Sequence, residues 1–439
     1  MKYTNYHSVV MGMGKTGLAC VKFLINQNKS VCIMDNRPVP PNLTTCQETY
    51  PNLPIITGHF DAEILAQATE IIISPGISRY EPALANAIAS GIPVISEIEL
   101  FARAANAPVV AITGSNGKST VTTLLWEMAE NAGLHVQAGG NLGTPALDLL
   151  CTPAPDLYIL ELSSFQLETT YSLNPKATVI LNISEDHMDR YQDLADYIEA
   201  KKRIYQGNGT IIINLDDPNV VASLPPQRQS LSFSLHHNQA DFRIADSYLV
   251  YKKIPLLATK DMRLQGSIMR ANALAALALG EAIGLPQTAM LETLKTFKGL
   301  AHRCAWVANK QGIDWYNDSK GTNVGATIAA IEGLEKPKQI ILIAGGEGKG
   351  ADFSPLTEVV AKHCQACVLI GRDAKLIAKH LTVPVSFAKT MKDAVIEAAK
   401  LAQNGEAVLL SPACASFDMF KNYEQRGNVF EEEVKSLAP

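Results

Sequence analysis

The sequence predicts an α/β protein of three domains, each built on a mostly parallel β-sheet. Short runs of consecutive apolar residues recur from one end of the chain to the other, and the segments between them show helical spacing. Consecutive apolar positions suit strands that are buried on both faces, as they are when helices cover both sides of a parallel sheet. The length of 439 residues accommodates about two to four domains at roughly 100–200 residues each.

The expected strands follow one another through the whole chain. They are Ser8–Met11, Val31–Met34, Ile71–Ile73, Val109–Thr113, Leu157–Leu162, Thr178–Ile183, Ile211–Asn214, Ile340–Ala344, Val368–Ile370 and Val408–Leu410. Residues Phe242–Leu264 alternate in the manner of half-buried strands, which predicts an antiparallel excursion, and an alanine-rich helix is expected at Ala271–Gly284. We place the three domains at residues 1–96, 97–301 and 302–439.

Composition and charge exclude several classes of protein. Hydrophobic residues make up 47% of the chain and charged residues 18%, which is too apolar for a disordered chain. The formal net charge of −5 leaves no basic surplus for a nucleic-acid backbone, and no apolar run approaches the ~18 residues that a membrane helix needs. Residues 1–7 lead straight into an expected strand, so we expect no signal peptide. We therefore expect a soluble, cytoplasmic protein of several domains that binds neither nucleic acid nor a membrane.

The eight cysteines are scattered along the chain, which is typical of reduced thiols in a long protein. Cys364 and Cys367 form a CxxC pair, but no second pair or ligand cluster accompanies them in the sequence. We interpret them as two buried thiols at the start of a strand rather than as a zinc or redox site.

A glycine-rich loop follows the first expected strand. The run Gly12-Met13-Gly14-Lys15-Thr16-Gly17 is a complete GxGxxG, and Asp35 ends the next strand. Glycines at these positions let the backbone turn tightly and approach a pyrophosphate at the helix N-terminus. The loop therefore predicts a diphosphate site, and both a dinucleotide and a nucleotide-sugar fit it.

A second phosphate loop follows the strand Val109–Thr113. The run Gly114-Ser115-Asn116-Gly117-Lys118-Ser119-Thr120 has fewer residues between its glycines than the usual GxxxxGK[ST]. Its backbone N–H groups still suit phosphates, Lys118 is able to reach the outer phosphates, and Ser119 or Thr120 suits Mg²⁺. The chain is therefore predicted to bind ATP or GTP.

Glu161 and His187 stand where ligands of a metal ion belong. Glu161 lies at the carboxyl end of one expected strand, and His187 follows the next strand in a polar run. Since the carboxyl ends of parallel strands meet at one edge of the sheet, both side chains are expected beside the same Mg²⁺. Asp186 and Asp189 are interpreted as local structure, through capping and loop hydrogen bonds.

Polar loops follow strands of the last domain at residues 317–323, 345–349 and 411–418. They carry groups suited to anions or ribose, and all are able to face the second phosphate loop. A chain with both a diphosphate site and an ATP loop indicates a transferase or ligase whose second substrate carries its own diphosphate. The alternatives are an NAD-dependent oxidoreductase, which leaves the ATP loop unexplained, and a non-catalytic nucleotide-sensing protein.

Several strings of residues carry a family resemblance that spans essentially the whole chain. They are TGSNGKST (113–120), ELSSFQLE (161–168), EDHMDRY (185–191), HR (302–303), NDSKGTN (317–323) and SPACASFDMFKNYEQRG (411–427). With them the chain resembles the Mur ligases of peptidoglycan synthesis, and within that family the branch that adds D-glutamate to UDP-N-acetylmuramoyl-L-alanine. The resemblance implies a Rossmann-like domain for the UDP group, a central ATPase domain and a Rossmann-like C-terminal domain. It implies an ATP-dependent amide ligase that acts through an acyl phosphate and a tetrahedral intermediate. Separately, we expect a monomer.

The resemblance also implies roles for individual residues. Those matched to ATP are Gly114, Ser115, Asn116, Gly117, Lys118, Ser119, Thr120, Asn272, His302, Arg303 and Asp318. Those matched to the UDP substrate are Gly14, Lys15, Thr16, Asp35, Asn36, Arg37 and Gly76, and those matched to D-glutamate are Thr322, Lys349, Ser416 and Tyr423. The catalytic set is Lys118, Asn141, Glu161, His187 and Lys201, with Ser119, Glu161, His187 and Lys201 as ligands of two Mg²⁺ ions.

Some of these positions depart from the family pattern or leave a choice. The family has a lysine that CO₂ converts to a metal-binding carbamate, and the match here is Lys201 in a Lys201-Lys202 doublet. The family's GxHN-like stretch reads here as Gly266-Ser267-Ile268-Met269-Arg270-Ala271-Asn272, so an adenine contact is expected from Asn272 alone. Tyr423 stands in place of a phenylalanine and Asn36 in place of a threonine.

Overall fold

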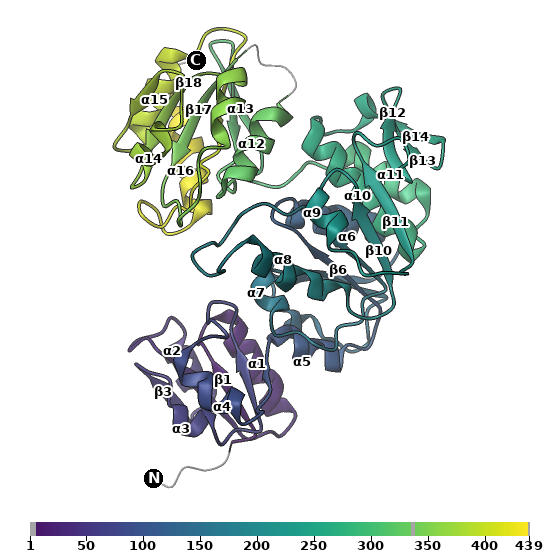
Figure 1. The fold of residues 1–439 in the computed structure, drawn as a ribbon, viewed down its shortest axis with the longest axis vertical. Coiled ribbons are helices and arrows are strands. Elements are labelled where there is room, and N and C mark those ends of the chain that lie inside the picture. The colour runs from purple at the N-terminus through teal and green to yellow at the C-terminus, as the bar shows by residue number, and fades with distance from the viewer. Residues whose placement is uncertain (1–5, 335–338, 438–439) are drawn as a thin grey trace.

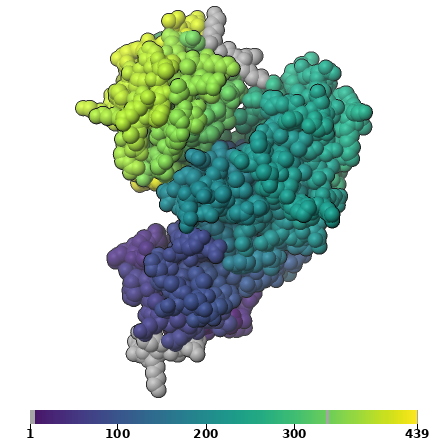
Figure 2. Space-filling view, in the orientation of Figure 1, coloured from purple at the N-terminus to yellow at the C-terminus, as the bar shows by residue number. Residues whose placement is uncertain are grey.

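The computed structural model describes residues 6–334 and 339–437, so the expectation about the first five residues lies outside the described residues. The described chain forms three domains in sequence order, each on its own sheet (Figure 1). The first and last domains both adjoin the central one, and in the space-filling view they appear as separate lobes (Figure 2). This arrangement confirms the predicted α/β class with three mostly parallel sheets.

The N-terminal domain holds, within its described residues, a five-stranded parallel sheet in the order β3-β2-β1-β4-β5. The strands are β1 Ser8–Met11, β2 Val31–Asp35, β3 Ile55–Thr57, β4 Glu70–Ile73 and β5 Val94–Ile95. The helices are α1 Lys15–Asn26, α2 Leu43–Thr49, α3 Ala62–Leu65, the 3₁₀ turn Pro82–Leu84 and α4 Ala85–Ala89. Every residue of β1 and β2 is buried, as expected for strands that are covered on both faces.

The central domain holds a nine-stranded sheet in the order β14-β13-β12-β11-β10-β9-β6-β8-β7, counted over the described residues. The strands are β6 Val109–Thr113, β7 Val136–Gly140, β8 Leu157–Glu161, β9 Ala177–Ile180, β10 Thr210–Asn214, β11 Ser230–Ser234, β12 Phe242–Ala245, β13 Tyr248–Tyr251 and β14 Ile254–Ala258. The α-helices are α5 Glu97–Ala104, α6 Lys118–Asn131, α7 Ser164–Leu167, α8 Leu194–Lys202, α9 Pro218–Ala222, α10 Ser267–Ile283 and α11 Gln287–Thr296. Shorter 3₁₀ turns lie at Ala146–Leu149, Arg203–Tyr205 and Thr259–Asp261.

The C-terminal domain holds, within its described residues, a six-stranded sheet in the order β15-β16-β20-β17-β18-β19. The strands are β15 Ala305–Lys310, β16 Ile313–Asn317, β17 Ile340–Gly345, β18 Cys364–Ile370, β19 Val385–Phe387 and β20 Ala407–Leu410. The helices are α12 Val324–Gly333, α13 Leu356–His363, α14 Ala374–Ala378, α15 Met391–Leu401 and α16 Tyr423–Ser436. Only β15 runs antiparallel to its described neighbour.

Several local predictions are confirmed. The antiparallel excursion exists as β12–β14, although it ends at Ala258 rather than Leu264 because the chain then forms a 3₁₀ turn. The alanine-rich helix is α10, which begins earlier than predicted, at Ser267. Cys364 and Cys367 are free, buried thiols in β18, as the CxxC interpretation requires.

Other local predictions are wrong. The strand expected at Thr178–Ile183 ends at Ile180, because Asn182 bonds through its side chain to the N–H and carbonyl of Asn116 instead of continuing the sheet. The hairpin β15–β16 was not among the predicted strands: the short apolar run at Ala305–Ala308 was not assigned, and β16 alternates buried with half-buried residues.

The helices of residues 6–334 and 339–437 include none that combines the length and the apolar character needed to span a bilayer.

Candidate active site

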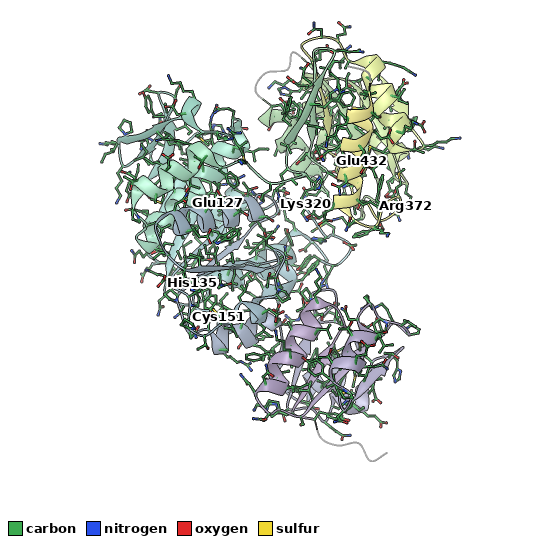
Figure 3. All side chains as sticks on the ribbon, turned by 180° about the vertical axis from the view of Figure 1, so that it is seen from behind. Glu127, His135, Cys151, Lys320, Arg372 and Glu432 are labelled. Carbon is green, nitrogen blue, oxygen red and sulfur yellow. The ribbon has the colours of Figure 1, made fainter. Side chains whose placement is uncertain are left out.

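The candidate site lies at the carboxyl edge of the central sheet, where the strand order reverses. β6 lies between β9 and β8, so the loop that follows β6 opens into the crevice between two halves of the sheet. Such crevices are the usual ligand sites of parallel sheets. The second phosphate loop occupies this position, and Lys320 of the last domain lies at the junction with the central domain (Figure 3).

The phosphate loop joins β6 to helix α6, whose first residue is Lys118. Gly117 precedes the helix with a φ of +83°, in the left-handed region that favours glycine. A Cβ atom at Gly117 would lie 2.7 Å from Asn272 Oδ1. Asn272, near the start of α10, is therefore packed against the phosphate loop. Ser119 and Thr120 are buried in the first turn of α6.

Lys118 and Lys201 both meet the backbone of this loop. Lys118 Nζ donates to the carbonyls of Gly114 (2.8 Å) and Ser115 (2.9 Å). Lys201 Nζ, from α8, donates to the Gly114 carbonyl over 2.9 Å and lies 4.5 Å from the ring centre of Tyr197. Burial lowers the pKa of both amines, and the charge of Lys118 lowers the pKa of Lys201 further. Lys201 is therefore deprotonated far more readily than an ordinary lysine.

The neighbouring Lys202 lies on the other side of the helix. Its Nζ is 2.6 Å from Glu199 Oε1, and both side chains are exposed to solvent. Lys201, in contrast, is only 1% exposed. Of the predicted doublet, the structure thus brings Lys201 and not Lys202 to the phosphate loop.

Glu161 ends β8 directly beside the loop and is buried. Its Oε1 accepts a 2.6 Å hydrogen bond from Asn141 Nδ2, and the Asn141 N–H donates to the Glu161 carbonyl over 2.7 Å. Its other oxygen, Oε2, is buried with no hydrogen-bond partner among the described residues. A buried carboxylate oxygen without a protein donor is suited to a cation.

His187 lies in the loop after β9, with a φ of +60°. Its imidazole packs on the ring of Phe165 at a centre-to-centre distance of 4.7 Å, and its Nε2 lies 3.6 Å from Asp186 Oδ2. Burial outweighs the attraction of Asp186 and lowers the pKa of His187 to about 4. The imidazole is therefore neutral at physiological pH, as a metal ligand must be.

Asp186 makes contacts beyond the capping and loop hydrogen bonds that were predicted for it. Its Oδ1 accepts from the His187 N–H, which is a loop bond of the expected kind, but also lies 3.0 Å from Nζ of Lys349 in the last domain. Its Oδ2 accepts from Asn323 Nδ2 over 3.2 Å. Asn323 also exchanges long hydrogen bonds of 3.3–3.4 Å with Asn116 of the phosphate loop. Asp186 therefore ties the last domain to the central one.

The last domain also brings cationic groups to the phosphate loop. Arg303 Nη2 donates to Ser119 Oγ over 2.5 Å. Lys320 Nζ lies 3.8 Å from the ring centre of Tyr423, and burial with the nearby charge of Arg303 lowers its pKa to about 8. Lys320 belongs to the string NDSKGTN, but no role was predicted for it. Its position three residues after the end of β16 is the sequence feature that could have indicated a role.

His302 and Asp318 are held inside the last domain. His302 is buried, and its Nδ1 lies 2.9 Å from Asn317 Nδ2. Asp318 Oδ2 accepts from the hydroxyl of Ser411 over 2.7 Å, and burial raises the pKa of Asp318 to about 6. The backbone next to Arg303 is held by the same groups, because the Lys320 N–H donates to the His302 carbonyl over 3.1 Å and the Cys304 N–H donates to Asp318 Oδ1 over 3.1 Å. The predicted ATP ligands His302 and Asp318 are thus engaged in contacts within the last domain.

The residues matched to D-glutamate come from loops at one edge of the C-terminal sheet. Lys349 follows β17 with a φ of +52° and is engaged with Asp186. Thr322 is half-buried before α12, Ser416 is buried after β20, and Tyr423 begins α16. In sequence, Thr322 follows β16, Lys349 follows β17, and Ser416 and Tyr423 follow β20, and it is Lys349 that contacts the central domain.

The GxGxxG loop of the first domain has the geometry that its glycines predict. Gly12 has a φ of +98°, and a Cβ atom at Gly17 would lie 1.9 Å from the Gly12 carbonyl oxygen. Gly14, the residue before α1, faces open space. Gly12 and Gly17 therefore build the tight turn, and Gly14 leaves room for a ligand. Lys15 and Thr16 follow in the first turn of α1.

Asp35 uses its carboxylate within the protein. Oδ2 accepts from the Met13 N–H over 2.8 Å, and Arg37 Nε and Nη2 form a two-point ion pair with it at 2.8 and 2.6 Å. These bonds, with Arg37 first, lower the pKa of Asp35 to about 2. Asp35 thus orients the half-exposed Arg37 beside the loop, next to Asn36. Gly76 lies in the turn after β4, which is the strand next to β1 in the sheet.

A metal site was predicted from Ser119, Glu161, His187 and Lys201. Among the described residues, no group of three or more His, Cys, Asp or Glu side chains is placed to hold a metal ion. The predicted set contains only two residues of those types, Glu161 and His187. The donor set is therefore incomplete without the hydroxyl of Ser119 and a modified Lys201.

Comparison with known families accounts for most of the chain. The family described as "Mur ligase MurD-like, N-terminal domain" matches residues 6–96. The "Mur ligase middle domain" matches residues 112–280, and the "Mur ligase, glutamate ligase domain" matches residues 302–414.

Individual relatives and solved structures agree with this assignment. The chain is 52% identical to the UDP-N-acetylmuramoylalanine--D-glutamate ligase of Nitrosococcus oceani, covering 98% of this chain and 96% of that protein. It is 50% identical to the enzyme of the same name from Pseudomonas syringae pv. syringae, covering 98% of each. Its fold is similar to a pseudomurein peptide ligase type C from Methanothermus fervidus, with a TM-score of 0.65 at 16% identity over 98% of this chain and 100% of that one. The MurF ligase of Thermotoga maritima is similar at a TM-score of 0.62 and 16% identity, over 100% of this chain and 97% of that one. These matches confirm the resemblance drawn from the sequence: the chain belongs to the Mur ligase family.

Proposed function

We propose that this chain joins D-glutamate to UDP-N-acetylmuramoyl-L-alanine and converts ATP to ADP and phosphate, in the synthesis of peptidoglycan precursors. The choice of substrates is supported by the name of relatives that are about half identical over nearly the whole chain. The observation that carries the ligase chemistry is the position of three charged groups at one phosphate loop: Lys118 lies on the loop, Glu161 ends the strand beside it and acts electrostatically on Lys118, and Arg303 reaches Ser119 from the last domain. Neither an NAD-dependent oxidoreductase nor a non-catalytic nucleotide sensor is favoured by these relatives.

The proposed reaction needs positive charge around a transferring phosphoryl group. A carboxylate is a poor electrophile, so its oxygen first attacks the γ-phosphorus of ATP, and ADP leaves. The amine of D-glutamate then attacks the acyl phosphate, and phosphate leaves from the tetrahedral intermediate. Lys118 lies on the loop itself, while Arg303 and Lys320 approach from the last domain. These cations are placed to neutralise charge that develops on the phosphoryl oxygens.

The chain's residues fit Mg²⁺ beside the ATP loop. The buried Glu161 Oε2 lacks a protein donor, and the imidazole of His187 is neutral. We assign Glu161, Ser119 and a carbamate on Lys201 to hold Mg²⁺, with His187 holding a second ion. Bound Mg²⁺ would supply Lewis-acid stabilisation of the phosphoryl oxygens.

Carbamylation of Lys201 is supported by the state of its amine. The neutral nitrogen attacks the carbon of CO₂ and releases one proton, which leaves a carbamate anion on the side chain. Only a deprotonated amine can react, and burial beside Lys118 lowers the pKa of Lys201 well below its ordinary value. The modification replaces a buried neutral amine with an anion that suits a metal ion.

The amino acid is assigned to the last domain and the UDP group to the first. Lys349 would receive a carboxylate of D-glutamate, with Thr322, Ser416 and Tyr423 around it. Gly14, Lys15, Thr16, Asp35, Asn36, Arg37 and Gly76 would form the UDP site. We assign these roles to domains bounded at residues 1–96, 97–301 and 302–439.

We further propose that the protein works as a monomer in the cytoplasm. The residues assigned to ATP, the UDP substrate and D-glutamate all lie within this sequence, so the proposed site calls for no residue of a second copy. ATP and nucleotide-linked precursors are cytoplasmic metabolites, which fits the assigned substrates.

The experiment that tests this function measures phosphate release from ATP and Mg²⁺ by the purified protein. UDP-N-acetylmuramoyl-L-alanine is present, and D-glutamate or L-glutamate is added or withheld. Release that requires both the UDP substrate and D-glutamate is expected. Release with a different amino acid would assign the chain to another branch of the family, and ATP binding without release would refute the ligase activity.

A further inference from the structure

Arg190 of the central domain binds the turn that follows β4 in the N-terminal domain. Its Nη1 donates to the Pro75 carbonyl over 2.5 Å, and its Nη2 donates to the Ile77 carbonyl over 3.2 Å. The turn is closed by a 2.9 Å hydrogen bond from the Ile77 N–H to the Ser74 carbonyl. One guanidinium group therefore holds the backbone on both sides of Gly76, which is assigned to the UDP site.

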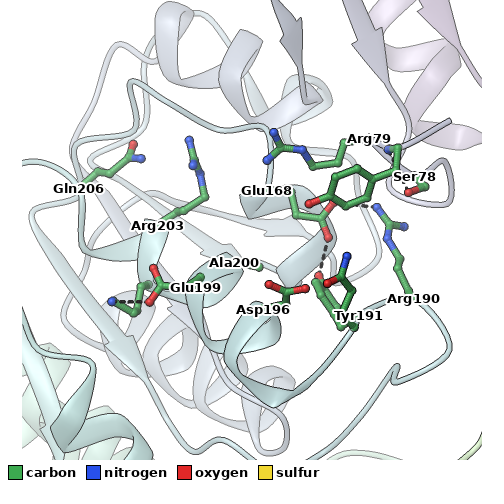
Figure 4. Close-up of a pocket in the computed structure, with 13 residues that line it drawn as sticks. Ser78, Arg79, Glu168, Arg190, Tyr191, Asp196, Glu199, Ala200, Arg203 and Gln206 are labelled. Atoms are coloured by element: carbon green, nitrogen blue, oxygen red, sulfur yellow. Dashed lines mark hydrogen bonds and ion pairs between the residues drawn. The ribbon is translucent and has the colours of Figure 1, made fainter. Parts of the chain in front are cut away.

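The same guanidinium is fixed within its own domain. Nη2 also donates to Glu168 Oε2 over 2.9 Å, and Cζ lies 3.9 Å from the ring centre of Phe165. Glu168 in turn accepts from the hydroxyl of Tyr191 over 2.6 Å (Figure 4). The side chains of Arg190 and Glu168 are only 14% and 9% exposed, so solvent screens their interaction little.

Phe165 connects this arginine to the histidine of the candidate site. The ring of His187 packs on Phe165, and the Arg190 N–H donates to the His187 carbonyl over 2.9 Å. One tight turn of the chain thus carries both the imidazole and the guanidinium, and both side chains pack on one ring. Within the N-terminal domain, Ser74 at the start of the bound turn donates its N–H to the Met11 carbonyl of β1 over 2.9 Å. A continuous chain of contacts therefore leads from the GxGxxG strand to His187.

We propose that Arg190 is a positioning residue that couples binding of the UDP substrate to the alignment of His187. This inference rests on the proposed function. A diphosphate bound beside Gly76 fixes the turn at residues 74–77, and the two carbonyls of that turn fix the guanidinium. The guanidinium and the short turn behind it then fix Phe165 and the imidazole. Without the guanidinium, the turn loses two charge-assisted hydrogen bonds, and His187 loses its tie to the first domain.

The test compares Arg190→Met and Arg190→Lys with Arg103→Met. A cavity of about 610 Å³ adjoins Arg190 (Figure 4), so methionine is chosen to limit the space left for water. Arg103 is a matched control because it also crosses to the first domain, where its Nη1 lies 3.0 Å from Glu70 Oε2. Glu70 begins β4, whereas the turn bound by Arg190 follows the other end of that strand.

Steady-state kinetics give the expected pattern. In Arg190→Met, the KM for the UDP substrate rises at least about tenfold, which is the effect expected from the loss of hydrogen bonds to a charged group. Its kcat falls because His187 is less well aligned, while the KM values for ATP and D-glutamate stay within about twofold of wild type. Arg190→Lys keeps the positive charge but loses the two-point hydrogen-bonding geometry of the guanidinium, so its KM and kcat lie between those of Arg190→Met and the wild type. Arg103→Met behaves as wild type.

Calorimetric titration with UDP alone keeps the test independent of the ligase reaction. Weaker UDP binding by Arg190→Met than by Arg103→Met, with unchanged ATP binding, supports the proposal. A KM and a UDP affinity within about twofold of those of Arg103→Met would overturn it. If circular dichroism shows Arg190→Met to be unfolded at the assay temperature, Arg190→Lys is judged by the same criterion. Failure of the wild-type protein to ligate would refute the proposed function, and the UDP comparison would still decide the role of Arg190.

Discussion

Replacement of Lys201 by alanine is the most direct test of the candidate site. Lys201 is 1% exposed and its Nζ donates to the Gly114 carbonyl, so the change removes a buried group that contacts the phosphate loop. If the side chain carries a carbamate that holds Mg²⁺, the change removes one group that stabilises the transferring phosphoryl. Loss of one such group typically lowers kcat by about 10²–10³. We expect a fall of at least that size in Lys201→Ala.

Lys202→Ala is the matched control, since it changes the next residue of the same helix. Its ion pair with Glu199 is exposed, and exposed pairs contribute about 0–1 kcal/mol. We therefore expect kcat within about twofold of wild type. Phosphate release is measured for both variants at saturating substrates, and for the wild type in buffer stripped of CO₂ and then supplied with bicarbonate. Loss of activity in Lys202→Ala but not in Lys201→Ala would refute the assignment, and wild-type activity indifferent to CO₂ would refute the carbamate.

Other substitutions test separate parts of the structure. Gly17→Ala places a Cβ atom against the Gly12 carbonyl, so we expect it to lower the free energy of unfolding by about 1–3 kcal/mol in urea titrations, whereas Gly14→Ala, which faces open space, changes it by less than about 0.5 kcal/mol. The folded-state pKa of His187 is about 4, against an ordinary value of 6.5. The unfolded chain therefore binds the proton more readily in this window, and stability falls as the pH drops from about 6.5 to 4. His187→Gln removes this contribution, so an unchanged pH slope in that variant would contradict the buried, neutral imidazole. Glu161→Gln keeps an acceptor for Asn141 but removes the charge, so we expect kcat to fall about 10²-fold with ATP affinity retained, and a kcat equal to wild type would exclude Glu161 as a metal ligand.

Much of the fold was predictable because buried parallel strands leave continuous apolar runs in the sequence. Strands β1, β6 and β8 therefore lie within about one residue of their predicted bounds. The phosphate loop and Glu161 were predicted for the same reason, since each directly follows or ends such a run. Lys201 could be singled out only by family resemblance, because a helical Lys-Lys pair does not show which member is buried.

The residue pairs that join the domains could not be predicted from the sequence, although the loop at residues 345–349 was expected to face the phosphate loop and both Arg303 and Ser119 were matched to ATP. Asp186 and Lys349 lie far apart in the chain, and their 3.0 Å ion pair depends on how the last domain is placed against the central one. The same holds for Arg303, whose bond to Ser119 joins two domains. The hairpin β15–β16 was not predicted because β16 alternates buried and half-buried residues and so lacks the continuous apolar run of the central strands. Local patterns report burial within one domain, whereas these contacts depend on rigid-body packing.

The ion pair between Lys349 and Asp186 has a consequence for how the affinity for the amino acid should be understood. Lys349, which is assigned to bind a carboxylate of D-glutamate, is already paired with the carboxylate of Asp186. The Asp186 side chain therefore occupies the position assigned to the substrate's carboxylate. Where D-glutamate binds as proposed, one carboxylate replaces another on the same ammonium group. The measured dissociation constant of the amino acid then describes an exchange of carboxylates. The corresponding binding free energy is smaller than that of the new ion pair by the free energy needed to break the Lys349–Asp186 pair. A tight-binding analogue of D-glutamate gains most by offering a separate donor to the displaced Asp186.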